Sequence, residues 1–401
     1  MRFRRYATWV GWLSALAWVG AGALGCGDDA PLHDLSTVEP FDFGDLPLDQ
    51  KGRSAELTLE VPPDAVSVTL VAHSPLAADV LMRVIDPAGE LITSDREGCA
   101  SMSGASRILS QASTTVAMLP NGDELPLAVG TYKIRVRPAD SYVDCAYPAP
   151  QGSVPISLRG LWKKVPMQGG RQGPLRGQRL AVNVFLVGDV PHNRQLDEGL
   201  QRMRSLYAKA GIDLGAPSII SIDGANGARF ARLALDEAGP ERELMKLSAM
   251  APQDGVNIFV VKEITFGAGY IVFGVAMGIP GTPERGSERS GLVVSSIILD
   301  PKHYDSNFAG NVMAHETGHF LGLYHSTEAY GMSDQISDTP NCPDWRDTNG
   351  NGYFERRECL DDDGNNLMFW EGDSFGDKET AAFGTITKGQ ADIMLRSAAT
   401  R

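Results

Sequence analysis

The sequence predicts an α+β (α/β) domain with a twisted mixed sheet at residues 179–401, preceded by an N-terminal β-sandwich domain at residues 51–162. Two observations support this division. In the first segment apolar residues alternate with a period of two, as in half-buried strands. In the second segment short apolar runs alternate with stretches of helical spacing, as in a sheet covered by helices.

Composition limits the possible partners. The chain has 401 residues, with 36 basic and 50 acidic side chains and a formal charge of −14. This length is enough for two or three domains. The acidic balance argues against nucleic acid as the main partner, because phosphate binding requires a basic face. No long apolar run follows residue 25, which excludes a polytopic membrane protein.

Residues 1–25 have the pattern of a secretory signal peptide, in which a basic start precedes an apolar run. The run ends at Ala23-Leu24-Gly25-Cys26, which resembles a bacterial lipobox. We therefore expect a protein exported to the cell envelope and lipid-anchored through Cys26, with the outer membrane or the cell surface favoured. Residues 26–50 are then a tether. Plain secretion and an uncleaved membrane anchor are the alternatives.

The predicted β-sandwich consists of short alternating segments separated by turns that contain Pro, Asp, Asn and Gly. These segments include residues 55–61, 66–70, 80–84, 132–136 and 154–158. No motif here is specific, so a structural spacer, a binding role and assistance in folding all stay open. Residues 163–178 are rich in Gly and Pro and are predicted to be a linker. Their basic side chains would allow cleavage that releases or activates the second domain.

The second domain alternates between strands and helices. Residues 180–187, 219–222, 256–261 and 292–298 are predicted strands. Residues 196–207, 228–250 and 311–323 have helical spacing. The order of these elements predicts a sheet with helices packed on it.

The last helix carries His315-Glu316-Thr317-Gly318-His319, and His325 follows. Histidines four positions apart lie on one face of a helix, so both can bind one zinc ion at about 2.0–2.1 Å. Gly322 lets the chain leave the helix sharply and bring His325 back as the third ligand. Three neutral nitrogen ligands leave the ion an open coordination position. Glu316 can face a water molecule at that position.

This motif, followed by Met368 in Asn366-Leu367-Met368, resembles the signature of the metzincin metallopeptidases. Over residues 179–401 the chain is most similar to the pappalysin family. The shared features are His325-Ser326, Asp338-Thr339-Pro340, Asn366-Leu367-Met368 and Thr387-Lys388-Gly389-Gln390. The resemblance implies a metzincin-like catalytic domain with an active-site helix, and Met368 in a tight turn beneath the zinc.

The resemblance also implies a zinc-dependent endopeptidase that hydrolyses peptide bonds in proteins by a metal-activated water. Glu316 is the catalytic base, and it returns the proton to the leaving amine. Substrates are proteins or peptides, aligned along an edge strand for which residues 274–280 are the candidate. Trp370 stands where many metzincins carry a tyrosine, and its indole N–H could donate a hydrogen bond. A non-catalytic surface adhesion or binding lipoprotein that retains a zinc-binding fold is the alternative.

A second metal site is predicted downstream of the histidines. Residues 347–358 have the spacing of an EF-hand loop, with Gly352 at the sixth position. Relatives in the pappalysin family also bind calcium in this region, so the resemblance implies a calcium site here as well. The candidate ligands are Asp347, Asn349, Asn351, Tyr353 and Glu358. An Asx-rich turn without metal is the alternative.

Four cysteines remain if Cys26 is lipidated, and an even number in an exported chain predicts two disulfides. Three pairings are possible. The simplest joins Cys99 to Cys145 and Cys342 to Cys359, each pair within one domain.

Overall fold

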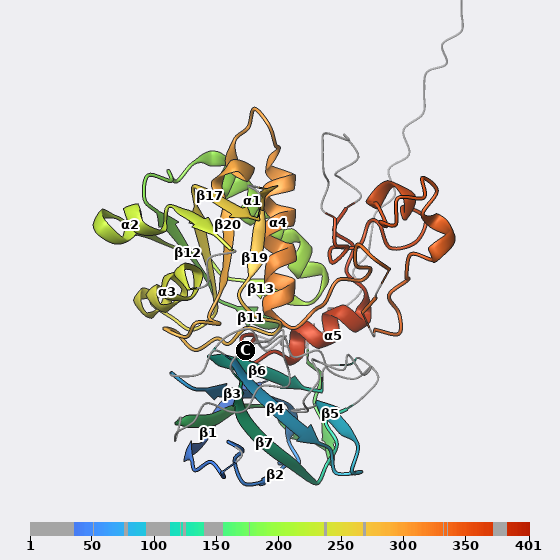
Figure 1. Cartoon of the computed structure of the whole chain (residues 1–401). Coiled ribbons are helices and arrows are strands. Elements are labelled where there is room, and N and C mark those ends of the chain that lie inside the picture. The colour runs from blue at the N-terminus through green and yellow to red at the C-terminus, as the bar shows by residue number, and fades with distance from the viewer. Residues whose placement is uncertain are drawn as a thin grey trace, which may run out of the picture. The chain divides into compact units, whose positions relative to one another are not determined.

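The computed structural model describes residues 36–50, 52–75, 79–93, 113–120, 122, 126–139, 155–175, 177–235, 239–267, 270–331, 333–334, 336–371 and 383–401 (Figure 1). The predicted signal peptide, Cys26 and the predicted Cys99–Cys145 pair lie outside these ranges. Within them, no helix has the length and apolar character that crossing a bilayer requires.

The described residues up to Lys164 form two four-stranded antiparallel sheets. The first sheet has the strand order β1 (Thr37–Leu46), β8 (Ile156–Lys164), β3 (Ala65–His73) and β6 (Thr114–Leu119). The second has the order β2 (Leu57–Glu60), β7 (Thr131–Ala139), β4 (Asp79–Ile85) and β5 (Leu91–Thr93). Both sheets contribute to one apolar cluster, in which Leu70, Val84 and Ile134 are fully buried. The predicted alternation therefore decides which side chains enter this core.

The predicted tether over residues 26–50 is wrong for residues 37–46, which form β1 and pair with β8. Phe41 explains the pairing. Its ring stacks on Trp162, with centroids 5.2 Å apart. It also covers Gly160, where a Cβ atom would come within 2.2 Å of the ring. A cross-strand aromatic contact thus orders a segment whose Pro, Asp and Gly content suggested irregular chain.

The predicted linker over residues 163–178 begins too early. Lys163 and Lys164 are the last residues of β8. A small hairpin follows, made of β9 (Met167–Gln168) and β10 (Arg171–Gln172). Pairing of β8 with β1 and β3 extends through both lysines, so the sheet continues past the apolar part of the sequence pattern.

The C-terminal part is built on a five-stranded mixed sheet. The strand order is β14 (Ser218–Ile222), β12 (Val182–Val187), β16 (Val256–Val261), β20 (Leu292–Ser295) and β19 (Gly274–Ala276). The first four strands are parallel, and β19 runs antiparallel to β20 at the edge. The three central strands consist only of buried residues, as expected for parallel strands covered on both faces.

Helices cover both faces of this sheet (Figure 1). On one face, α1 (Arg194–Lys209) and α4 (Ser306–Phe320) share a core with Val184 and Ile258. On the other face, α2 (Gly224–Phe230) and α3 (Pro240–Lys246) share a core with Phe185 and Phe259. Neighbouring residues on one strand therefore enter different helical layers.

Shorter elements complete this part. The helical pattern predicted over residues 228–250 is interrupted by the strand β15 (Arg232–Ala234), which pairs with β17 (Glu263–Phe266) and through it with β18 (Tyr270–Ile271). Strand β11 (Gln178–Leu180) pairs with β13 (Ile212–Leu214), and α5 (Lys388–Arg396) lies near the C-terminus. Short 3₁₀ helices occur at Leu247–Met250, Ser296–Leu299, Asp344–Arg346 and Arg356–Glu358.

Lys163 joins the N-terminal sheets to the last residues of the chain. Its side chain is fully buried. Its amino group donates hydrogen bonds to the carbonyl oxygens of Ser397 and Thr400 and to the hydroxyl of Thr400. Burial holds the pKa of this amino group well below its ordinary value. A protease that cuts the predicted linker therefore has no access to Lys163.

We expect Lys163→Ala to lower the free energy of unfolding by about 2–4 kcal/mol, because buried acceptors would lose their donor. Urea unfolding measures this change. Lys164→Ala is the matched control on the same strand, since Lys164 pairs with Glu39 near the surface. Such pairs contribute about 0–1 kcal/mol. Equal effects of the two substitutions would contradict the role of Lys163.

Candidate metal centre

Helix α4 carries the first two histidines of the predicted motif. Its N-cap is Asp305, whose carboxylate accepts a hydrogen bond from the backbone N–H of Phe308 at 2.8 Å. The helix ends before Gly322, which has a φ of +109°. Cε of Met118 packs closely on this glycine, 2.8 Å from where a Cβ atom would lie. This turn directs the following residues back towards the helix, as predicted.

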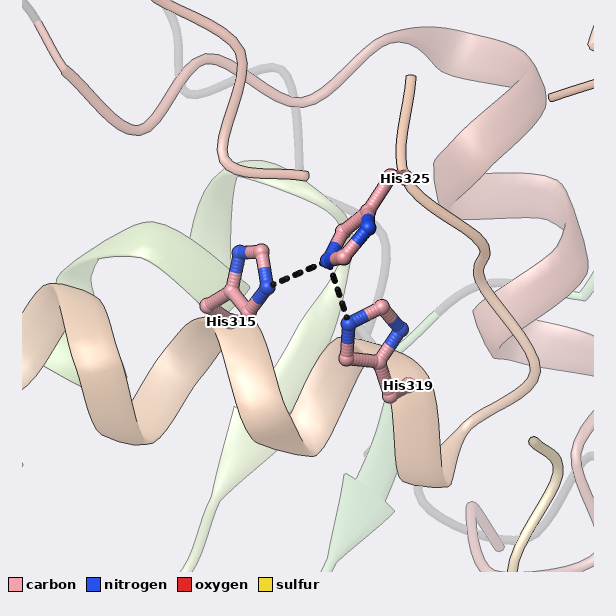
Figure 2. Close-up of side chains that lie close together, drawn as sticks. All are labelled: His315, His319 and His325. Carbon is pink, nitrogen blue, oxygen red and sulfur yellow. Dashed lines mark hydrogen bonds between the residues drawn. The ribbon is translucent and has the colours of Figure 1, made fainter. Parts of the chain in front are cut away.

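The turn brings three imidazole rings together (Figure 2). Nε2 of His325 lies 3.2 Å from Nε2 of His315 and 3.1 Å from Nε2 of His319. Three nitrogens bound to one tetrahedral ion at about 2.0–2.1 Å would lie about 3.3 Å apart. The spacing of the nitrogens and their chemistry therefore fit zinc with one open coordination position.

The other nitrogen of each ring faces an acceptor. Nδ1 of His315 lies 2.7 Å from the Leu367 carbonyl oxygen, and Nδ1 of His319 lies 2.7 Å from that of Leu323. Nδ1 of His325 lies 2.9 Å from a carboxylate oxygen of Glu328, as an electrostatic contact rather than an aligned hydrogen bond. These acceptors favour a proton on Nδ1, which leaves the Nε2 lone pairs for a metal.

Burial keeps the helical histidines neutral, as metal ligands must be. Burial, and secondarily the neighbouring His325, lowers the pKa of His315 to about 3. The same causes lower the pKa of His319 well below its ordinary value. The sequence motif identified the three ligands but not the acceptors that orient them, because two of those acceptors are backbone carbonyls.

Met368, the methionine of the predicted turn, packs against α4 at Gly318, next to the second histidine. Met368 is fully buried. If residue 318, between the two helical ligands, carried a Cβ atom, that atom would lie 2.5 Å from the Met368 sulfur. Only glycine at that position lets the methionine approach the helix so closely. The Met368 carbonyl accepts a hydrogen bond from the N–H of Ser326, the residue after the third histidine. The turn therefore contacts both sides of the ligand set.

A side-chain pair supports this turn from α5. The amides of Asn366 and Gln390 exchange two hydrogen bonds of 3.0 Å, and both residues are buried. The side-chain oxygen Oδ1 of Asn366 also accepts from the backbone N–H of Met368 at 2.8 Å. Gln390 and Thr387 form a capping box at the start of α5. The residues that resembled the end of the pappalysin domain thus hold the methionine turn in place.

Glu316 lies between α4 and the edge strand β19. Its side chain is buried, which raises the pKa of its carboxyl group to about 8, and the backbone N–H of Ala276 donates a hydrogen bond to it. At Gly274 a Cβ atom would come within 2.6 Å of the Glu316 side chain. The glycine therefore lets the strand approach the carboxylate. A bound cation would act against burial and favour the ionised form.

A cavity of about 180 Å³ opens beside this carboxylate. Most of its lining is aromatic or apolar, and its walls include Phe273, Phe308, Asn311, Val312, Trp370 and Phe383. The Trp370 indole N–H donates to the Phe354 carbonyl oxygen at 2.6 Å. The hydrogen bond that this indole was expected to donate is therefore made to the backbone of the chain itself.

The candidate calcium ligands lie in an exposed loop. The N–H of Asn351 donates to side-chain oxygens of Asp347 and Asn349, and its own side-chain oxygen accepts from Tyr353. Glu358 accepts from the N–H of Thr348. The structure thus brings the first three ligands together and places Glu358 against the start of the loop, by hydrogen bonds typical of an Asx-rich turn. The predicted Cys342–Cys359 disulfide is present and brackets this loop.

Comparisons with known proteins agree with this centre. Residues 245–394 match the family model described as Pregnancy-associated plasma protein-A, a peptidase family. "Extracellular metalloprotease" of Arthroderma benhamiae is 26% identical over 177 residues, covering 40% of this chain and 59% of that protein. The protein of the same name from Colletotrichum graminicola is 30% identical over 126 residues, covering 28% of this chain and 41% of that protein. This chain therefore spans less than two thirds of these relatives.

A solved structure, metalloproteinase-II from Bacteroides fragilis, aligns with 44% of this chain and 55% of its own, at 12% identity and a TM-score of 0.26. That similarity is too weak to establish a common fold. The family match, in contrast, covers Glu316 and all three histidines. Residues 245–394 therefore resemble a pappalysin-like metallopeptidase, as the motif predicted.

Proposed function

We propose that the protein is a zinc-dependent endopeptidase of the metzincin type that hydrolyses peptide bonds in proteins or peptides outside the cytoplasm. The observation that supports this most directly is the convergence of three Nε2 atoms beside the buried carboxyl group of Glu316. The competing function is a non-catalytic binding protein that keeps the zinc-binding fold. Burying a carboxyl group costs stability, and a scaffold gains nothing from that cost.

His315, His319 and His325 would hold the ion, and zinc bound there would polarise a substrate carbonyl and acidify a water molecule. Glu316 follows the first ligand on α4, so its carboxylate would accept the proton of the attacking water. The same carboxyl group would then deliver that proton to the leaving amine. Its burial supports this second step, because a raised pKa favours a carboxyl group that can hold a proton.

Strand β19 would align an extended substrate. Phe273 and Met277, which flank it, exchange backbone hydrogen bonds with the β20 side. Hydrogen-bonding directions alternate along an antiparallel strand, so Gly274 and Ala276 direct their backbone groups to the free edge. That edge faces Glu316, to which Ala276 donates. A peptide added there as a further strand would pass the proposed base.

The N-terminal sheets and the cellular location complete the proposal. The two sheets share one core, which supports a β-sandwich domain. The curated relatives are named extracellular, which supports export. We propose anchoring through a lipidated Cys26 on the sequence pattern alone.

We also propose that calcium binds the loop over residues 347–358. Support comes from the convergence of Asp347 and Asn349 oxygens on one backbone N–H. Calcium prefers such oxygen donors at alternate loop positions, and a glutamate at the twelfth position closes its shell. Its role would be to order the segment between the third histidine and the methionine turn.

Replacing Glu316 by Ala should lower cleavage of a fluorogenic peptide by at least about 10²-fold, because the proton acceptor is lost. Zinc content, measured by mass spectrometry, should stay at the wild-type level since all three ligands remain. Glu328→Ala is the comparison. It removes a carboxylate that contacts the zinc ligand His325, and it leaves the proposed base Glu316 in place. Full activity of the Glu316 variant would refute its assignment.

His319→Ala should lose most of its bound zinc, because two nitrogen ligands hold the ion much less tightly than three. The purified variant is compared with His303→Ala, which removes an exposed histidine paired with Asp300. Wild-type zinc content is expected in that control. Phenanthroline should inactivate the wild type and its His303 variant alike. Equal zinc content in both variants would contradict the proposed site.

Adding Ca²⁺ after EGTA treatment should raise the melting temperature of the wild type, because a ligand that binds only the folded state stabilises that state. At a Ca²⁺ concentration one hundred times the Kd, the free energy of unfolding should increase by about 2.7 kcal/mol. Glu358→Ala should abolish the shift. Asp361→Ala, at an exposed position outside the loop, should retain it. If Ca²⁺ changes neither the melting temperature nor the heat measured by calorimetry, the loop is an Asx-rich turn without metal.

A further inference from the structure

We propose that the cavity beside Glu316 receives a large apolar side chain of the substrate, next to the scissile bond, and that Arg202 is the positioning residue that fixes the width of this cavity. This inference rests on the proposed peptidase function, and it adds a substrate class and a specificity-determining residue to it. The cavity is bounded by the Glu316 side chain, by the first zinc ligand and by the edge strand at Gly274. A peptide aligned along that strand would therefore place one side chain at its mouth.

The walls of the cavity are mainly apolar. Phe273 packs edge-on against Phe308 with ring centroids 5.2 Å apart, and Val312 and Phe383 extend this apolar lining. The indole N–H of Trp370 is already bonded to the backbone, so this residue has no donor left for a ligand. The volume of about 180 Å³ is close to the 150 Å³ of an apolar cavity that binds benzene in another protein. A leucine, methionine or phenylalanine side chain fits such a space.

The polar side chains of the lining do not offset the burial of a charged substrate group. Asn311 uses its side-chain oxygen to accept a hydrogen bond from Arg202, and its amide nitrogen is buried away from the cavity space. Among the described lining residues, Glu316 is the only acidic side chain, and none is lysine or arginine. A charged side chain would lose its hydration and meet no counter-charge apart from the proposed base. The lining therefore favours an apolar side chain over a charged one.

Arg202 on α1 connects two of these walls. Its Nε donates to the side-chain oxygen of Asn311 at 3.0 Å, and its Nη2 donates to the carbonyl oxygen of Phe383 at 2.7 Å. Asn311 lies on α4, one turn before His315, whereas Phe383 lies in the segment that leads to α5. A guanidinium is planar, so its donors hold two acceptors at a fixed spacing. The distance between α4 and the Phe383 segment is therefore set by a single side chain.

The backbone at Phe383 is shaped by its contact with α1. Gly384 has a φ of +101°, and a Cβ atom there would lie 2.9 Å from Cδ2 of Leu206 and 3.3 Å from Nη2 of Arg202. The glycine therefore lets the backbone approach α1 closely enough for the Phe383 carbonyl oxygen to accept the hydrogen bond. The guanidinium of Arg356 also contacts the Phe383 ring, 5.3 Å from its centroid. Loss of the Arg202 hydrogen bonds would release this wall from α4, and the cavity would lose its fixed width.

Cleavage of a peptide library by the zinc-loaded wild type tests the substrate class. We expect cuts next to leucine, methionine or phenylalanine, and a kcat/KM for a leucine peptide at least about tenfold above those of its alanine and lysine twins. Arg202→Met removes both donors, and Arg202→Lys keeps the charge without the planar fork. Each should lower the leucine-to-alanine ratio at least about threefold, because contacts with a fixed wall are lost. A merely structural role would lower both rates together and leave the ratio unchanged.

Arg204→Met is the matched control. Arg204 lies on the same helix and also donates to two carbonyl oxygens, those of Leu214 at 3.0 Å and Gly215 at 3.2 Å. Neither acceptor belongs to the cavity lining. This variant should therefore keep the wild-type leucine-to-alanine ratio.

Binding of toluene to the zinc-loaded wild type gives a readout that needs no catalysis. Calorimetry should show toluene binding at least about tenfold more tightly than n-butylamine, which carries the charge of a lysine side chain. Toluene should bind at least about threefold more weakly to both Arg202 variants and with wild-type affinity to Arg204→Met. If no peptide is cleaved but toluene binds in this pattern, the peptidase function fails and the assignment of the cavity stands.

Two results would overturn the proposal. One is a leucine-to-alanine ratio that stays at its wild-type value in Arg202→Met and Arg202→Lys. The other needs no variant, so it holds even if neither variant folds: wild-type cuts next to lysine, arginine or alanine at rates equal to those next to leucine.

Discussion

The structure depends on one electrostatic constraint, which is that Nε2 of His325 must lie within 3.2 Å of Nε2 of both His315 and His319, with the lone pairs directed inward. Charged rings would repel at this distance, so the two helical rings, His315 and His319, must be neutral and protonated on the far nitrogen. Burial in α4 provides the first condition for His315 and His319. The carbonyl oxygens of Leu367 and Leu323 provide the second.

Those carbonyl oxygens tie the metal centre to segments far away in the sequence. Leu367 belongs to the methionine turn, which the Asn366–Gln390 amide pair fastens to α5. Met368 packs against Gly318, and its carbonyl oxygen accepts a hydrogen bond from the N–H of Ser326. The Cys342–Cys359 disulfide closes the segment between the third histidine and this turn. The C-terminal helix therefore serves the metal centre even though it supplies no ligand.

The sequence predicted this centre well because its geometry is mostly local. Four-residue spacing on a helix and a glycine at the helix end determine where His315 and His319 lie, and where the chain turns towards His325. The failures concern contacts between distant segments. Nothing around Phe41 indicates that it stacks on Trp162, so residues 37–46 resembled a tether. The hydrogen bond between Arg202 and Asn311 was equally hidden, because the two residues lie on different helices.

Contacts between distant segments also connect the N-terminal sheets to the surroundings of the metal centre. Met118 on β6 packs in the core of the C-terminal part rather than in the core of the N-terminal sheets. Its methyl group contacts Gly322 at the turn before His325. Arg289 donates to the carbonyl oxygens of Thr114 on β6 and of Met277 after the edge strand. One N-terminal strand thus contacts both the turn that delivers the third ligand and the strand proposed to align substrate. The N-terminal sheets and the part that carries the metal centre therefore belong to one compact unit, which extends from Leu32 to Arg401.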